Sequence, residues 1–426
     1  MSSTDTDERA ARPGGASIFD GPVATAASRA DGRRNRNLQW LRAFAALSVV
    51  LYHASVYLDR FVGDDRFLRL FDGRFGLLGV AIFFAISGYL MAEILPRTDP
   101  WSFLTHRVVR IYPIFLIVLG SLIVARGKFA EFDLWAMTLV PVGEGRIYYL
   151  GVEWTLLFET SFYVFLFVCS LIGLKRHLDV VALIWLGSLS VAPFIVPLDQ
   201  TILTPTAAQL PFMAVNAAFA GGLLLPRLIR LGLVQPALAV IAVGSMLLSG
   251  AFSFGGDRWV AAATAVFLVG FAVAYDRTFP VHDGVVARSL DRLGDWSYAL
   301  YLCHAPLIIG LMISRPPIPA ELLWVAGVLG PLCVAIPYGI IDIRLYAILK
   351  RGIDTAPGLV RIAIASVYVA AFLAVAGFAA IRGTGATAQA PIAQPVAAPR
   401  VPSTEPTAPT LVPVPTVPVP PPLRLP

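Results

Sequence analysis

Arg42 and His53 are the first candidates for chemistry, because they interrupt an otherwise apolar segment, LQWLRAFAALSVVLYHA (38–54). An ionisable side chain costs about 2–3 kcal/mol or more inside a bilayer, so it normally faces a protein interior or a wet cavity. Eleven residues of α-helix turn through about 1100°, within about 20° of whole turns, and rise about 16 Å. The two side chains are therefore predicted to share one helix face. The alternative is that Arg42 reaches the lipid headgroups and His53 caps a carbonyl group.

Arg107 and Arg110 form a second pair, in the segment THRVVRIYPIF (105–115). Guanidinium groups three residues apart share a helix face and make a forked site of the kind that phosphates prefer. We expect Pro113 to restrict the start of this helix. The alternative is an ordinary pair of basic anchors at the cytoplasmic surface.

Glu159 and Tyr163 are neighbours one helical turn apart in GVEWTLLFETSFYVF (151–165), so both can point into the same interior. A buried carboxylate needs a partner. An imidazole is a natural one, because the carboxylate would hold it in one tautomer and raise its basicity. A purely structural bond of Glu159 is equally compatible with the sequence.

Further polar residues lie at helical spacing in GDWSYALYLCHAPLI (294–308), where Ser297, Tyr301 and His304 form one stripe. Packing alone would explain the tyrosine, but a histidine within a bilayer points to function. In FFAISGYLM (83–91), Ser87 and Gly88 are expected to permit close approach of a neighbouring helix.

The composition determines what kind of element carries these residues. Of 426 residues, 57% are hydrophobic and only 14% are charged, with a mean hydropathy of +0.74. This balance cannot cover a soluble globule with polar surface. We predict an all-α polytopic membrane helix bundle with about eleven transmembrane helices. The expected spans are 38–58, 75–95, 111–125, 148–172, 178–197, 209–230, 233–253, 258–275, 295–313, 321–348 and 360–381, and 129–141 is expected to be a re-entrant or interfacial piece.

Basic residues predict the orientation. The segment before the first span holds six arginines and no apolar core behind a basic region, so we expect no cleavable signal peptide and a cytoplasmic N-terminus. With eleven spans the C-terminus would lie outside the cell. The net charge of +6 then reflects topology, and we expect no nucleic-acid partner. Cys169, Cys303 and Cys333 fall in apolar spans and are interpreted as small buried hydrophobes, not as disulfides or metal ligands.

The two ends of the chain have a different composition from the middle. Residues 1–37 are rich in Gly, Ala and Arg, which is typical of a disordered tail. Residues 384–426 contain thirteen prolines and should be extended, as an inert tail, a spacer or a wall-contacting arm. The predicted organisation is therefore a cytoplasmic tail (1–37), a membrane core (38–350), an extra transmembrane helix (351–383) and a Pro-rich tail (384–426).

Five motifs, taken together in this order, resemble the integral-membrane acyltransferase-3 family, whose members O-acylate sugars of exopolysaccharide, lipopolysaccharide O-antigen and peptidoglycan. The resemblance covers about 38–350, and its opening segment is most similar to exopolysaccharide acetyltransferases of the succinoglycan type. The motifs are Arg42-x10-His53, FFAISGYLM, RVVRIYP, WTLLFETSFY and GDWSYALYLCH. One departure is YGIIDIRL, where Asp342 stands for the family's Glu and Arg344 for its Pro.

The resemblance implies a ten-helix core in a cell's inner (plasma) membrane, plus one extra helix. It implies acyl-CoA, with acetyl favoured, as the donor, no metal, and a polysaccharide or lipid-linked sugar as the acceptor. Arg107 and Arg110, together with Arg42, would bind the donor's phosphates, and Ser297 and Tyr301 would line its pocket. His53 would act as general base or carry the acyl group. The other implied catalytic residues are Glu159, which would orient His53, Tyr163 and His304.

Two other classes of function compete with an enzyme. A secondary transporter or flippase for a lipid-linked sugar would also place His, Glu and Arg in its spans, and it predicts unwound helices at Pro-rich breaks such as APFIVP and GPLCVAIPYG. A structural protein that tethers wall polymer through its Pro-rich arm would leave Arg42, His53, Glu159 and His304 without a role. The sequence does not determine the oligomeric state.

Overall fold

The computed structural model describes residues 35–195, 198–248, 257–276 and 284–382, and these residues form helices without a strand. The predicted tails fall almost wholly outside this part of the chain. The α-helices are α1 (Arg36–Val62), α2 (Gly73–Ile94), α3 (Pro100–Arg126), α4 (Leu134–Met137), α5 (Glu153–Leu171), α6 (Leu178–Ile195), α7 (Asn216–Arg230), α8 (Pro236–Leu248), α9 (Asp257–Ala274), α10 (Val285–Ser314), α11 (Ala320–Thr355) and α12 (Gly358–Arg382). Short 3-10 turns occur at Leu95–Arg97, Phe129–Glu131, Leu174–Arg176 and Leu210–Phe212.

Polar residues cap the first three helices and determine where they begin. The side chain of Asn35 accepts a hydrogen bond from the Leu38 N–H at the start of α1. The Asp72 side chain accepts from the Arg74 N–H at the start of α2. The Asp99 side chain accepts from the Ser102 N–H at α3, where Pro100 occupies the first helical position. Each cap satisfies one of the N–H groups that a helix start leaves without a partner.

The prediction of an all-α multi-pass membrane protein is confirmed. Each of the eleven predicted spans contains a helix. Within the described residues, nine helices are long and apolar enough to cross a bilayer. The two remaining helices, α7 with 15 residues and α8 with 13, are shorter than a straight span requires.

The predicted start of the third span was wrong. α3 begins at Pro100, and Pro113 lies inside the helix. The polar first half of α3 does not register in a hydropathy pattern, whereas the Asp99–Pro100 cap marks the true start. The segment expected to be re-entrant or interfacial, 129–141, forms a 3-10 turn and the four-residue α4.

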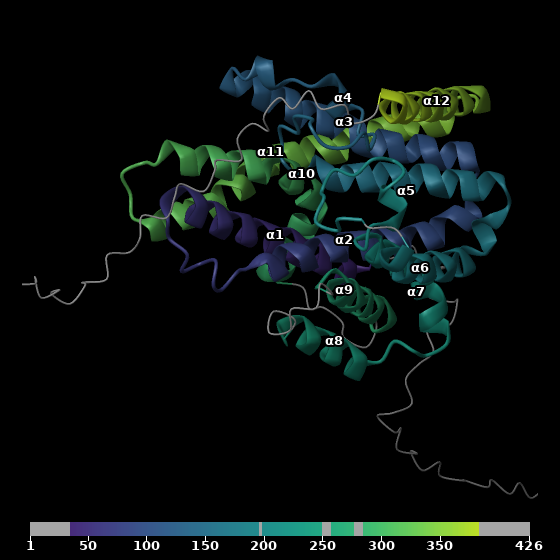
Figure 1. Cartoon of the computed structure of the whole chain (residues 1–426), viewed down its shortest axis with the longest axis horizontal. Coiled ribbons are helices and arrows are strands. Elements are labelled where there is room, and N and C mark those ends of the chain that lie inside the picture. Colours follow the sequence, from purple (N-terminus) through teal and green to yellow (C-terminus); the bar gives the residue numbers. More distant parts are fainter. Residues whose placement is uncertain (1–34, 196–197, 249–256, 277–283, 383–426) are drawn as a thin grey trace, which may run out of the picture.

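The helices that carry the candidate residues pack together in the middle of the bundle (Figure 1). α1 packs against α2 and α10, α10 packs against α11, and α3 packs against α5, α11 and α12. Gly88 on α2 and Gly222 on α7 allow the two backbones to touch, because a Cβ atom on Gly88 would collide with the Phe219 carbonyl oxygen. This agrees with the close helix approach expected for FFAISGYLM.

The structure also bears on the helix breaks that a transporter would require. α11 continues without interruption through Pro331 and Pro337, so the segment GPLCVAIPYG is not unwound. Cys169 and Cys303 are buried as predicted, but Cys333 on α11 is exposed, so its predicted burial was wrong. α11 places Cys333 on the outer surface of the bundle, where a helix in a membrane meets lipid.

Candidate active site

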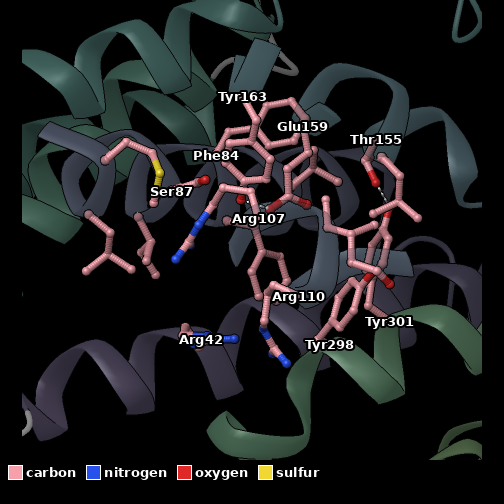
Figure 2. Close-up of a pocket in the computed structure, with 17 residues that line it drawn as sticks. Arg42, Phe84, Ser87, Arg107, Arg110, Thr155, Glu159, Tyr163, Tyr298 and Tyr301 are labelled. Atoms are coloured by element: carbon pink, nitrogen blue, oxygen red, sulfur yellow. Dashed lines mark hydrogen bonds between the residues drawn. The ribbon is translucent and has the colours of Figure 1, made fainter. Parts of the chain in front are cut away.

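A cavity of about 150 Å³ lies between α1, α2, α3, α5 and α10. Six of the predicted site residues line it: Arg42, Arg107, Arg110, Glu159, Tyr163 and Tyr301. Its remaining wall is mostly apolar and comes largely from the FFAISGYLM segment of α2. In Figure 2, Arg42 and Arg107 lie toward one side of the cavity, while Thr155 and Tyr301 lie toward the other. The cavity is therefore cationic toward one side and neutral toward the other.

Arg110 is held firmly by its neighbours. Its Nη1 donates to both carboxylate oxygens of Asp342, at 2.7 and 2.8 Å, and its guanidinium lies over the rings of Tyr298 and Tyr346. Asp342 is 2% exposed. Asp342, whose role the sequence left undefined, is thus the counter-ion of Arg110. Both arginines of the predicted anion site line the cavity, but they differ, because Arg110 already has a carboxylate partner.

Arg107 has a different environment. Its guanidinium lies 6.0 Å from the ring centroid of Phe103 and 5.8 Å from that of Tyr163. Its Nε atom is buried and has no hydrogen-bond partner among the described residues. A buried donor without an acceptor is costly, and a bound anion would supply the missing acceptor. Arg107 is the arginine best prepared to bind an anionic ligand.

Glu159 bonds to its own helix neighbour. The Tyr163 hydroxyl donates to Glu159 Oε1 at 2.5 Å, and both side chains face the cavity. The expectation that Glu159 orients His53 is wrong in this structure, because His304 occupies that position. Glu159 instead supplies the negative charge on a wall that also carries three arginines.

His53 and His304 are in direct contact. His53 Nδ1 lies 2.8 Å from His304 Nε2, and the ring centroids are 4.9 Å apart. His304 is fully buried, and its Nδ1 lies 2.7 Å from the Tyr301 carbonyl oxygen and 3.2 Å from that of Leu300. α1 and α10 therefore bring together two histidines that are 251 residues apart in sequence.

The hydrogen-bond chain assigns the tautomers of both rings. A carbonyl oxygen only accepts, so the proton of neutral His304 is on Nδ1 and its Nε2 carries a lone pair. That lone pair can accept only from a proton on His53 Nδ1. Neutral His53 is then left with its lone pair on Nε2, which is the form of imidazole that removes protons or attacks an electrophile.

The histidine pair adjoins the cavity but does not line it. Tyr301 links the two, because it lines the cavity and its ring centroid is 5.6 Å from that of His304. The Tyr301 hydroxyl accepts from Thr155 Oγ1 at 2.8 Å and lies 3.4 Å from the Val152 carbonyl oxygen. Thr155 Oγ1 also lies 3.1 Å from that carbonyl oxygen, so the two hydroxyls and the carbonyl form one hydrogen-bond cluster.

Other residues of the same helices differ from their expected roles. Ser297 is fully buried and donates to the Gly294 carbonyl oxygen within α10, so its predicted place in the pocket is wrong. Tyr298 lines the cavity instead, and its spacing of three residues from Tyr301 was the signal that could have identified it. Glu153 is 1% exposed and accepts the N–H groups of Leu150 and Val152 at the start of α5. Its carboxylate therefore holds the turn that leads into α5.

Comparison with known proteins gives one family and two named relatives. A family model described as an acyltransferase domain matches residues 35–342, a range that contains all five cavity-lining helices. The exopolysaccharide production protein ExoZ of Rhizobium meliloti (strain 1021) is 29% identical over 250 residues, which cover 54% of this chain and 75% of that protein. Nodulation protein 10 of Rhizobium leguminosarum bv. viciae is 29% identical over 352 residues, 71% of this chain and 90% of that protein. No solved structure matches the chain.

Proposed function

Because this chain belongs to the acyltransferase family whose model matches residues 35–342, we propose that it moves an acyl group from acyl-CoA to a sugar hydroxyl of an exported or surface polysaccharide. The enzyme class, O-acyltransferase, follows from the family. The name of the relative ExoZ, an exopolysaccharide production protein, supports a polysaccharide as acceptor. The cavity lined by arginines supports an anionic donor, and among such donors we favour acetyl-CoA.

The donor's position follows from the charges of the cavity. Arg107 offers a buried Nε–H that the protein leaves unused, and Arg42 lies on the same side of the cavity. The diphosphate of CoA would bind there, because guanidinium groups bind phosphate oxygens strongly in a site of low dielectric. The uncharged pantetheine arm would follow the apolar wall formed by α2. Its thioester would then reach the neutral side, near Tyr301 and Thr155.

The chemical step uses His53 as general base. Its Nε2 takes the proton of the sugar hydroxyl while the hydroxyl oxygen attacks the thioester carbonyl carbon. A C–O bond forms, the C–S bond breaks, and the departing thiolate takes the proton back from His53. His304 Nε2 accepts the Nδ1–H of His53 throughout, so it stabilises the transient imidazolium and keeps the ring oriented.

Tyr301 is positioned to polarise the thioester. Its hydroxyl lies 2.8 Å from Thr155 Oγ1 and 3.4 Å from the Val152 carbonyl oxygen, so the acceptors that the protein offers to its proton are both uncharged. A thioester oxygen that becomes negative in the transition state is a better acceptor than a neutral peptide carbonyl. Tyr301 would therefore bind the transition state more strongly than the ground state, which is the condition for catalysis.

The proposed location is the plasma membrane, with the N-terminus in the cytoplasm and the C-terminus outside. In that orientation Arg42 lies near the cytoplasmic face, where acyl-CoA is made, and His53 lies about 16 Å further along α1, toward the acceptor. We assign catalysis to residues 38–350. α12 packs against α3 as an addition to that core, and the Pro-rich end of the chain would follow it outside.

One observation carries this proposal: an imidazole whose tautomer is fixed by a second histidine lies next to a cavity lined by arginines. The test is mass spectrometry of surface polysaccharide from cells with and without the gene. We expect each modified sugar to lose the mass of one acyl group when the gene is removed, which identifies both the group and the acceptor. Identical polysaccharide from both strains, together with no release of CoA thiol by the purified protein, would refute the proposal.

A further inference from the structure

A second cavity adjoins the first at Arg107. It lies between the end of α2, the start of α3 and the end of α11. The residues that matter for its chemistry are Phe103, His106, Arg107, Tyr346, Lys350 and Asp354. Tyr346, Lys350 and Asp354 lie beyond residue 342, where the match of the family model ends.

The polar groups of the second cavity favour an anion. Asp354 is its one carboxylate, and it bonds to His106 Nε2 at 2.9 Å. Lys350 is exposed and, within the described residues, has no carboxylate within ion-pair distance. Arg107 adds its buried, unsatisfied Nε. The cavity therefore contains two cations and a histidine but only one carboxylate, which is already hydrogen-bonded to that histidine.

The two cavities share Arg107, and aromatic rings line the walls next to it. The ring of Phe103 lies beside the Arg107 guanidinium. The Arg110 guanidinium lies 5.3 Å from the ring centroid of Tyr346. A single extended ligand could therefore pass from one cavity to the other while an anionic group in its middle contacts Arg107. CoA has this arrangement of groups: an uncharged pantetheine arm, a diphosphate in the middle, and an adenosine that carries a separate 3′-phosphate.

We infer that the second cavity binds the 3′-phosphoadenosine end of the donor, with Lys350 and His106 contacting the 3′-phosphate. This inference rests on the proposed function, because it takes acyl-CoA as the donor. A lysine is suited to a phosphate as a mobile point charge at the mouth of a site, whereas Arg107 holds the diphosphate at the junction. Phe103 and Tyr346 supply the apolar surface for the adenine ring.

The experiment compares two donors, acetyl-CoA and acetyl-3′-dephospho-CoA, with protein in phosphatidylcholine nanodiscs. For the wild type, we expect the KM for acetyl-CoA to be roughly three- to tenfold lower than the KM for acetyl-3′-dephospho-CoA. Lys350→Ala should raise the KM for acetyl-CoA by that factor and leave the KM for the dephospho donor unchanged. Lys350→Arg should keep the preference. Arg351→Ala is the matched control, because Arg351 is an exposed cation next to Lys350 that lines neither cavity.

The opposing outcomes are distinct. An unchanged preference in Lys350→Ala would overturn the inference, as would an equal loss for both donors, which would indicate a lipid headgroup on Lys350. If the wild type transfers from neither donor, the proposed function fails, and adenosine 3′,5′-bisphosphate then tests the cavity alone. Thermal stabilisation of the wild type but not of Lys350→Ala by this probe would support the site. Equal stabilisation of both, or stabilisation of neither, would overturn it.

Discussion

His53 Nδ1 and His304 Nε2 lie 2.8 Å apart, and the Tyr301 carbonyl oxygen fixes the proton on the far nitrogen of His304. This chain of two hydrogen bonds leaves the base nitrogen of His53 unprotonated. It also explains why a fully buried histidine lies in the middle of a membrane helix. His304 acts through His53, as a positioning residue.

His304→Gln should lower kcat by roughly 100-fold while leaving the KM for acetyl-CoA within about twofold. The variant loses the acceptor that orients His53 and stabilises its cationic form, but it keeps the arginine cavity. Steady-state kinetics with purified protein measure both constants. A normal kcat would show that His53 needs no partner, and a selective rise in KM would move His304 to the donor site.

Arg107→Ala should raise the KM for acetyl-CoA by roughly tenfold or more, because it removes a guanidinium whose buried Nε–H no protein group uses. Folding should be little affected, since no carboxylate is left without its partner. Arg107→Lys should restore part of the affinity, because lysine supplies the positive charge but not the forked pair of N–H donors of a guanidinium. Unchanged affinity in Arg107→Ala would exclude Arg107 from phosphate binding.

Asp342→Ala should destabilise the protein by about 3–5 kcal/mol, because it leaves the Arg110 guanidinium largely buried without its counter-ion. Replacing both residues by leucine should recover much of that loss. Thermal unfolding in detergent gives the comparison. If Asp342→Ala has the same melting temperature as the wild type, the ion pair does not stabilise the contact between α3 and α11.

Gly88→Ala should destabilise the protein by about 1–3 kcal/mol, because its Cβ would meet the α7 backbone at Phe219 and Gly222. Gly120→Ala is the control, since a Cβ there meets nothing within 4 Å. Alanine at position 120 should be neutral or stabilise α3 by up to about 1 kcal/mol. Equal melting temperatures for the two variants would contradict the close contact of α2 and α7.

Helix existence could be predicted from sequence, because apolar composition over about 20 residues is a local property. The helical repeat alone predicts that Arg42 and His53 share one face of α1; in the structure Arg42 lines the cavity, whereas His53 adjoins it through His304. The start of α3 was missed because its first turns are polar, although the Asp99–Pro100 cap was present in the sequence. Pattern and cap have to be considered together.

Contacts between helices could not be predicted from sequence alone. Glu159 and His304 were both reasonable partners for His53, and only the relative height and rotation of α1, α5 and α10 decide between them. The same limit applies within α10, where Tyr301 belongs to two stripes and the one with Ser297 was chosen over the one with Tyr298. Asp342 could not be assigned to Arg110 because 232 residues separate them.

The most direct test of the account is acyl transfer by His53→Ala in a protein that still inserts and still binds acetyl-CoA. The arginine cavity does not include His53, so the Kd for acetyl-CoA should match the wild type, while transfer to the sugar acceptor should fall by roughly 10³-fold or more. Transfer at the wild-type rate with unaltered donor binding would contradict the assignment of His53 as the base.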